Sequence, residues 1–378
     1  MRRCDVLIVG GGPAGSSCAR SLVESAFDVV VLDQARFPRD KTCGGWITPV
    51  VLQLLAIDCM EYAKTNVLQP ITGFHVSCLG RSGVRIPFAS IVSYGIRRFE
   101  FDDYLLKRCG AHVYDGTRVN QIQRDGRSWV INGSFSAPML VGAGGHFCPV
   151  ARMLGARVAA EPAVLAQQAE WQFRSPVDPA EPELLFFPDR RGYAWRLQKQ
   201  DFINVGLGRL GPDSLAPYRR QFLDWLRIHG APHSQPPAWH GHAYLTADAS
   251  RRNVCDDGVL LVGDAAGLAD PRSGEGIRQA VESGLMAAQC IAEARGECSR
   301  AELAPYALML RARYSPRSLP WPVPGFVARG AMSVPWFVRE VVVKRWFLHL
   351  NDHPLPITVG QVVQPADRLP IGPSTHKL

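Results

Sequence analysis

The sequence lacks the features of a membrane-spanning, disordered or disulfide-stapled protein. It contains no uncharged apolar run of about 18 residues, and its mean hydropathy is −0.04. Charged residues make up 20% of the 378 positions and apolar residues 47%, which is too apolar for intrinsic disorder. None of the ten cysteines belongs to a CxxC pair, and we expect reduced thiols in a chain of this length without an export signal.

The first residues superficially resemble a signal peptide, with a basic start and a short apolar core. Asp5 interrupts that pattern, and the apolar run ends in glycines rather than in a cleavage site. We therefore expect a cytoplasmic protein, and the length indicates two or three domains.

The net charge is +8 and is unevenly placed. Residues 301–378 hold nine Lys and Arg against four Asp and Glu, a surplus of +5. No Lys/Arg-rich run or nucleic-acid-binding motif is present, so nucleic acid is not an expected partner. The basic balance favours an anionic substrate, an acidic partner protein or a membrane surface.

The N-terminal segment predicts a dinucleotide-binding βαβ unit. An apolar run at 5–9 leads into a glycine-rich turn and a helix, and a second apolar run at 29–32 ends at Asp33. The residues of the turn are Gly10, Gly12, Pro13, Ala14 and Gly15. The glycines permit a tight turn, close approach of the backbone to a pyrophosphate and packing of helix on strand, and the helix N-terminus faces the phosphates. Asp33 is placed to accept hydrogen bonds from the ribose hydroxyls, which favours FAD or NAD over NADP.

A second GxGxxG pattern is formed by Gly206, Gly208 and Gly211. Pro212 follows directly, and no second strand with a ribose-binding carboxylate comes after it. We interpret it as a glycine-permissive strand end near a ligand. The chain then has one dinucleotide fold, so NAD(P)H, if used, visits transiently.

The segment GDAAGLADPRSGEGI, residues 263–277, resembles the second FAD motif of the p-hydroxybenzoate hydroxylase superfamily. The resemblance implies FAD, with Gly263 and Asp264 near the ribityl chain and Asp264 binding its hydroxyls. It also implies that Gly274, Gly276 and Ile277 face the pyrimidine edge of the flavin. A helix N-terminus at that edge stabilises negative charge on the reduced ring.

Other segments resemble motifs of the same superfamily, and within it of the geranylgeranyl reductases and the related flavin-dependent halogenases. Arg98 in RFEFDDYLL resembles an arginine near the FAD, and residues 141–152 resemble the central motif with Gly144 in place of its Asp. Residues 36–49, RFPRDKTCGGWITP, resemble a loop that lies along the flavin, which implies that Cys43 and Gly44 contact it.

The substrate motif is matched less closely. Residues 192–208 resemble the reductases' Y.W.FP…G.G pattern through Tyr193 and Trp195, but Leu197 and Gln198 replace Phe-Pro. With Trp46, these aromatic residues suit an isoprenoid tail or an aromatic substrate, and ordinary core packing is the alternative. The W.W.IP pattern of a halogenase is absent, so halogenation is not expected.

These observations predict an α/β fold: a Rossmann-like FAD-binding domain of the glutathione-reductase type with an inserted antiparallel-sheet (α+β) substrate domain and a helical C-terminal tail. We expect the FAD-binding domain at 1–70, 97–157 and 250–300, the substrate domain at 71–96 and 158–249, and the cap at 301–378.

The expected function is that of an FAD-dependent oxidoreductase with NAD(P)H as transient reductant. One hypothesis, favoured by a small margin, is a monooxygenase that uses oxygen on an aromatic or specialised metabolite, which a partner polypeptide could carry. The other is an ene-reductase that saturates isoprenoid double bonds, in which Cys43 is the candidate catalytic residue. A non-catalytic FAD-binding partner protein is the alternative of another class.

Two further segments are open to more than one interpretation. His229, His233, His240 and His242 crowd one segment, but without Cys or a helical i, i+4 pair we predict no metal site. Residues 319–350 are apolar, aromatic and basic. They could lie on a membrane, cover the pocket of a lipid-like substrate, or pack as a helical cap.

Overall fold

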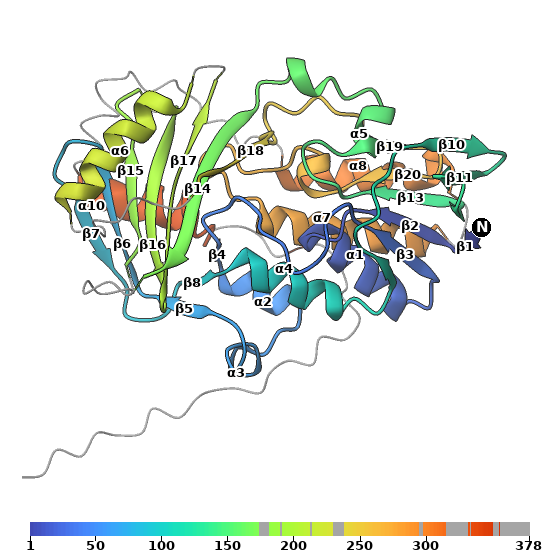
Figure 1. Ribbon diagram of the computed structural model, residues 1–378, viewed down its shortest axis with the longest axis horizontal. Helices are drawn as coiled ribbons and strands as arrows, with labels where there is room; N and C mark the ends of the chain where they lie inside the picture. Colours follow the sequence, from blue (N-terminus) through green and yellow to red (C-terminus); the bar gives the residue numbers. More distant parts are fainter. Residues whose placement is uncertain are drawn as a thin grey trace, which may run out of the picture.

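The computed structural model describes residues 1–173, 181–189, 191–211, 214–229, 238–294, 298–314, 332, 334–350 and 355. Two main sheets, each with its own helices, stand side by side along the long axis of the molecule (Figure 1). The first has six strands in the order β19-β20-β13-β2-β3-β9. Their bounds are β2 Val6–Val9, β3 Val29–Leu32, β9 His112–Tyr114, β13 Met139–Gly142, β19 Cys255–Asp256 and β20 Val259–Leu261.

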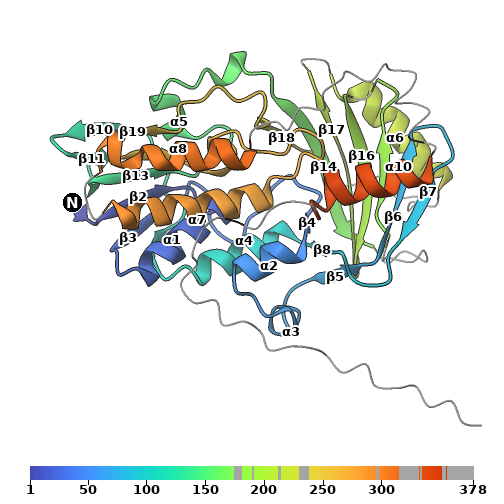
Figure 2. The same ribbon diagram turned by 180° about the vertical axis from the view of Figure 1, so that it is seen from behind.

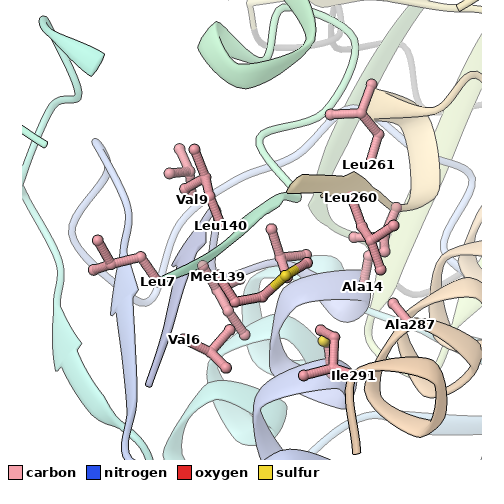
Figure 3. Packing of buried hydrophobic residues seen from close by; sticks show 14 of the residues in the cluster. Val6, Leu7, Val9, Ala14, Met139, Leu140, Leu260, Leu261, Ala287 and Ile291 are labelled. Carbon is pink, nitrogen blue, oxygen red and sulfur yellow. The ribbon is translucent and has the colours of Figure 1, made fainter. Parts of the chain in front are cut away.

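The six-stranded sheet is parallel except for β19. Every residue of β2, β3 and β13 is buried, as the continuous apolar runs predict for a parallel sheet covered on both faces. Helices α1 (Pro13–Glu24) and α7 (Ile277–Glu293) pack against each other beside this sheet. Figure 3 shows the strand residues Val6, Leu140 and Leu260 converging on Ala14 and Ile291 of the two helices.

The two helices approach closely at Gly284, where a Cβ would lie 2.4 Å from the backbone oxygen of Ala14. Helix α8 (Arg300–Tyr314) continues this layer, and its Leu303 and Tyr306 are buried in the same hydrophobic cluster. The Tyr306 hydroxyl donates a hydrogen bond to the Leu261 oxygen at 2.6 Å. Residues 301–314, which we assigned to the cap from the sequence, therefore pack on the dinucleotide side of the molecule.

The second main sheet has seven strands in the order β18-β14-β17-β16-β15-β6-β7. Their bounds are β6 Gly73–Cys78, β7 Val84–Pro87, β14 Val164–Gln172, β15 Glu183–Phe186, β16 Gly192–Lys199, β17 Phe202–Leu210 and β18 His240–Tyr244. All neighbours are antiparallel except β15 and β6. The segment 192–208, which resembles the reductases' substrate motif, lies on β16 and β17.

Helices cover both faces of the seven-stranded sheet. Helix α6 (Ala216–Ile228) lies on one face (Figure 1), and the opposite face carries α10 (Pro335–Phe337) and η3 (Val338–Phe347) (Figure 2). We call residues 335–347 the tail helix. Val338, Val342 and Val343 of this helix are buried against the sheet, which fits the interpretation of this part of the C-terminal segment as a packed cap.

Two smaller sheets and several short helices complete the described fold. A three-stranded sheet has the order β4-β8-β5, and a four-stranded sheet has the order β1-β12-β11-β10. The strands are β1 Arg2–Arg3, β4 Trp46–Ile47, β5 Leu68–Ile71, β8 Ser93–Ile96, β10 Ile122–Asp125, β11 Ser128–Ile131 and β12 Phe135–Ala137. The helices are α2 Pro49–Leu54, α3 Cys59–Tyr62, α4 Arg98–Lys107, α5 Pro149–Met153, η1 Val158–Ala160 and η2 Gly263–Ala265.

Two expectations can be compared with this fold. All ten cysteines fall within the described residues, and no disulfide joins any two of them there. In the described part of the chain, no helix has the length and hydropathy needed to cross a membrane.

Candidate functional site

A cavity of about 660 Å³ lies where the two main sheets meet. It is lined by nearly all residues that the sequence predicts for the cofactor and the substrate: Gly10, Gly12, Pro13, Ala14, Asp33, Cys43, Gly44, Trp46, Arg98, Tyr193, Trp195, Asp264, Gly274, Gly276 and Ile277. Gly15 and Gly263 are not among the lining residues. Gly15 instead lets helix α1 pack closely on the preceding turn, because a Cβ on Gly15 would lie 1.9 Å from the Gly10 oxygen.

The glycine-rich turn forms one end of the cavity. Gly10 has φ +113°, and a Cβ on it would lie 2.3 Å from the Ala143 backbone oxygen, so only glycine fits. Among the described residues no side chain caps the N-terminus of α1, whose amide groups are left for an anionic ligand. Asp33 accepts hydrogen bonds from the amides of Gly11 at 2.7 Å and Ala35 at 2.8 Å, which fix its carboxylate beside the turn.

Asp264, in η2, also lines the cavity. Burial alone would raise its pKa, but the hydrogen bond with His242 and the charge of Lys41 lower the pKa of Asp264 to about 2. Lys41 contacts the His242 ring, and burial lowers the pKa of Lys41 to about 8. The ionised carboxylate of Asp264 is therefore able to accept hydrogen bonds from hydroxyl groups of a ligand.

The loop before α7 also faces the cavity. Gly274 has φ +69°, and helix α7 begins at Ile277 without a side-chain cap among the described residues. Asp270 accepts hydrogen bonds from two amides of the loop, including that of Ser273 at 2.8 Å. The Tyr193 hydroxyl donates to the Ser273 oxygen, so the seven-stranded sheet holds this loop in place.

The loop that carries Cys43 is held by buried polar side chains of the seven-stranded sheet. The Cys43 amide donates to Gln168 Oε1 at 3.2 Å, and the Cys43 oxygen accepts from Asn204 Nδ2 at 3.3 Å. Asn204 is fully buried, and its Oδ1 accepts a hydrogen bond from Trp195 Nε1 at 2.7 Å. These bonds fix the backbone of Cys43 on both sides of its side chain.

Glu170 supplies the charge in this network. It accepts hydrogen bonds from Asn204 at 3.0 Å, from the fully buried Lys199 at 2.8 Å and from Arg97 at 3.0 Å. Burial would raise the pKa of Glu170, but Lys199 and the other donors lower it to about 2. Arg98, predicted from its motif, lies nearby and forms two hydrogen bonds of 2.7 Å with the buried Asp102.

An apolar part of the cavity, which we call the aromatic chamber, is lined by Trp46, Leu184, Tyr193, Trp195, Leu197 and Phe347. Trp195 lies over Gly206, where a Cβ would be 2.2 Å from its ring. Gly206 and Gly208 lie within β17, which pairs antiparallel with both of its neighbours. The second GxGxxG pattern is therefore no nucleotide-binding turn but leaves room for Trp195 beside the cavity.

Several cavity residues were not predicted as site residues. Arg39, Lys41, His242, Tyr244 and Phe347 line the cavity. Arg39 Nη2 lies 3.3 Å from where a Cβ of Gly12 would be, which places a cation beside the phosphate-binding turn. Arg39 and Lys41 stand inside the quoted segment RFPRDKTCGG, so the signal for these two was present in the sequence.

The histidine-rich segment shows no metal site in its described part. No group of three or more potential ligands occurs among the described residues. His229 stacks on Trp225 with ring centroids 4.3 Å apart, and His242 faces Asp264. His233 lies outside the described residues.

The fold and the cavity define a dinucleotide-binding protein, and the groups that line the cavity fit FAD: a glycine cradle for the pyrophosphate, an ionised Asp264 that can accept from hydroxyl groups, and an α7 N-terminus with no side-chain cap among the described residues. Residues 3–313 match the model of the FAD binding domain family. The chain belongs to this family, and it is an FAD-dependent oxidoreductase.

Curated relatives are named as reductases. The chain is 29% identical over 317 residues to the menaquinone reductase of Mycolicibacterium smegmatis, covering 76% of each protein. It is 26% identical over 328 residues to the digeranylgeranylglycerophospholipid reductase of Methanothrix thermoacetophila, covering 77% of this chain and 78% of the relative.

Solved structures share the fold. A geranylgeranyl bacteriochlorophyll reductase-like protein from Thermoplasma acidophilum superposes with a TM-score of 0.75, 22% identity and 88% of both chains covered. The flavin-dependent halogenase CmlS gives a TM-score of 0.64 and 23% identity, with 83% of this chain and 63% of that chain covered. The proteins similar to this chain thus include a geranylgeranyl reductase-like structure and a flavin-dependent halogenase, the two groups that the motifs of the sequence resemble.

Proposed function

We propose that the protein is an FAD-dependent ene-reductase that saturates carbon–carbon double bonds of an isoprenoid lipid. The observation that carries this proposal is the aromatic chamber, which continues the FAD-binding part of the cavity with apolar side chains. Tyr193 brings the one hydroxyl among the six chamber side chains, and it already donates to the Ser273 oxygen. A chamber without a free polar group favours an apolar chain over a polar substrate.

The names of the relatives support the same substrate class. Menaquinone and digeranylgeranylglycerophospholipid, named for two of them, both carry isoprenoid chains. Leu197 and Gln198, which replace Phe-Pro, gave a small preference for a monooxygenase. The names of the relatives favour the ene-reductase instead. The monooxygenase is kept as an alternative outcome of the test.

Different parts of the chain are assigned to FAD binding and to substrate binding by where they line the cavity. The turn at Gly10–Gly15, Asp33, Asp264 and the start of α7 would hold FAD, with the segments 1–70, 97–157 and 250–300 as its domain. FAD, once bound and reduced by a transient NAD(P)H, supplies the hydride. Residues 71–96 and 158–249 would form the substrate domain, and 301–378 the cap.

Cys43 is the proposed reactive residue of the chain itself. Its amide and oxygen are fixed by Gln168 and Asn204, and its thiol accepts a hydrogen bond from the Gly45 amide at 3.3 Å. Cys43 is among the residues that line the cavity, which supports a role for its side chain in proton transfer to the substrate. A cytoplasmic location and contact with an acidic partner or a membrane surface stay predictions.

The test is anaerobic reduction of the FAD-loaded protein by NAD(P)H, followed by mixing with prenyl lipids or with oxygen and an aromatic compound. Reoxidation of the flavin by a prenyl lipid, with a product heavier by one H₂, supports the proposal. A product heavier by one oxygen atom, formed only with oxygen, would replace it with the monooxygenase. Absence of flavin bleaching with NADH and NADPH, with or without any of these substrates, would favour a non-catalytic FAD-binding protein.

A further inference from the structure

The tail helix forms one wall of the aromatic chamber. Val338, Val342, Val343 and Phe347 of this helix are buried in one cluster with Ile71, Phe74, Val76, Leu184 and Leu197 of the sheet region. Leu184 and Leu197 also line the cavity. The helix lies across the face of the seven-stranded sheet that is opposite to α6 (Figure 2). The C-terminal segment therefore contributes to the substrate side of the cavity as well as to packing.

Phe347 is the residue of the tail helix that reaches the cavity. Its ring is 2% exposed and stacks on Trp46, with ring centroids 5.2 Å apart and an interplanar angle of 22°. The same ring meets Tyr193 edge-on at 5.4 Å and 79°. Phe347 thus stands between two of the aromatic residues predicted for the substrate, and it closes the chamber on this side.

The position of Phe347 is fixed from the cofactor side of the cavity as well. Two residues further along, His349 Nε2 lies 2.8 Å from Glu275 Oε2. Glu275 lines the cavity and belongs to the loop between Ser273 and α7. The end of the tail helix is therefore attached both to the chamber and to the loop that faces the FAD-binding part, which leaves the Phe347 ring little freedom to move aside.

We propose that Phe347 is a specificity-determining residue that limits the length of the isoprenoid chain the chamber accepts. This inference rests on the proposed function for the class of substrate. Its physical basis is the close packing of protein interiors: a ring held on several sides cannot give way without loss of contacts, so it ends the space open to a chain. Replacing Phe347 with alanine removes roughly one isoprene unit of carbon volume from that wall.

The test uses the full-length FAD-loaded protein and saturated prenyl alcohols of increasing length, which bind without reacting. Their dissociation constants are measured by quenching of tryptophan fluorescence, since Trp46 and Trp195 line the chamber. Phe347→Ala should shift the preferred length by about one isoprene unit and raise the ratio of long-chain to short-chain affinity by about ten-fold or more. Phe347→Trp should shift the preference toward shorter chains.

The matched control is Trp346→Ala in the same helix. Trp346 packs on Phe337 with ring centroids 6.3 Å apart and is not among the cavity-lining residues. The control should leave the length preference unchanged. Where the alanine variant does not fold, Phe347→Leu retains more of the buried volume and should give a smaller shift in the same direction.

An unchanged length preference in every Phe347 variant that folds, or an equal shift in Trp346→Ala, would overturn the inference. The binding assay needs no turnover, so its result is separate from that of the proposed function. If the unmodified protein binds the alcohols but reduces no prenyl lipid, the proposed reaction fails while the role of Phe347 in length selection is still decided.

Discussion

The ion pair of Lys199 and Glu170 offers a direct test of how the Cys43 loop is supported. Lys199 is fully buried, and its Nζ lies 2.8 Å from Glu170 Oε2. Lys199→Met keeps most of the apolar stem of the side chain and removes the charge. Glu170 then stays buried with Asn204 and Arg97 as its remaining donors.

The size of the effect follows from the pKa of Glu170, which is lowered from 4.5 to about 2 although burial alone would raise it. A pKa lowered this far corresponds to about 3 kcal/mol of stability, which Lys199, Asn204 and Arg97 supply together against the cost of burial. Because the folded-state pKa lies below the unfolded one, this stabilisation is present above pH 4.5 and is lost as the pH falls toward 2. Lys199→Met should lower the unfolding free energy at neutral pH by about 3 kcal/mol and weaken its acid dependence.

Urea unfolding of the FAD-loaded protein at neutral pH and at several acidic pH values measures both effects. The double variant Lys199→Met/Glu170→Gln should recover much of the loss, because no unpaired charge is left buried. Lys344→Met is the surface control. Its ion pair with Glu340 at 2.7 Å is more exposed, and its loss should cost less than about 1 kcal/mol. An equal, small effect of Lys199→Met and Lys344→Met would refute the reasoning.

Three further variants test the site and an ion pair outside the cavity lining. Gly10→Ala should weaken FAD binding by roughly thirty-fold or more, because the added Cβ lies 2.3 Å from a backbone oxygen. Flavin fluorescence titration measures the affinity, and an unchanged value would contradict the assignment of this turn to the pyrophosphate. Tyr193→Phe removes the hydrogen bond to Ser273 and should cost about 1 kcal/mol in thermal unfolding, whereas no loss would mean that this bond does not hold the loop. Arg252→Met leaves the partly buried Glu161 without its ion-pair partner and should cost about 3 kcal/mol in guanidinium unfolding, and a cost below 1 kcal/mol would count against the pairing.

Much of the dinucleotide side could be predicted because its signals are local in sequence. The strand at 29–32 follows from an apolar run and the first helix from the glycine-rich turn before it, and both are present in the structure. The structure brings Gly10, Asp33 and Asp264 to one cavity, although more than 200 residues of the chain separate the last two. Gly10 stands where the backbone conformation requires glycine, whereas Asp33 and Asp264 were predicted from the hydrogen bonds that their carboxylates can accept.

Some residues reach the cavity from segments that are distant in sequence from the cofactor motifs. Their contacts could not be predicted from local sequence. Phe347 belongs to an apolar, aromatic segment, and nothing in that segment distinguishes it from Trp346, which packs away from the cavity. His242 belongs to a histidine-rich segment whose sequence predicts a loop. In the structure it lies on β18, which places its ring beside Asp264. Only the pairing of distant strands and helices decides which of these side chains meets the ligand.

The polar side chains that hold the Cys43 loop show why the alternation of polar and apolar residues along a strand does not by itself predict which face is exposed to water. Glu170 of β14 pairs with Asn204 of β17, and Gln168 pairs with Gly206, so the three polar side chains share one face of the sheet. Polar residues at every second position of a strand ordinarily indicate a face toward water. Here that face is turned toward the Cys43 loop, and Asn204 is fully buried. The buried charge of Glu170 is tolerated because Lys199 and Arg97 meet it, and this compensation depends on strand register and on a helix start that local sequence does not specify.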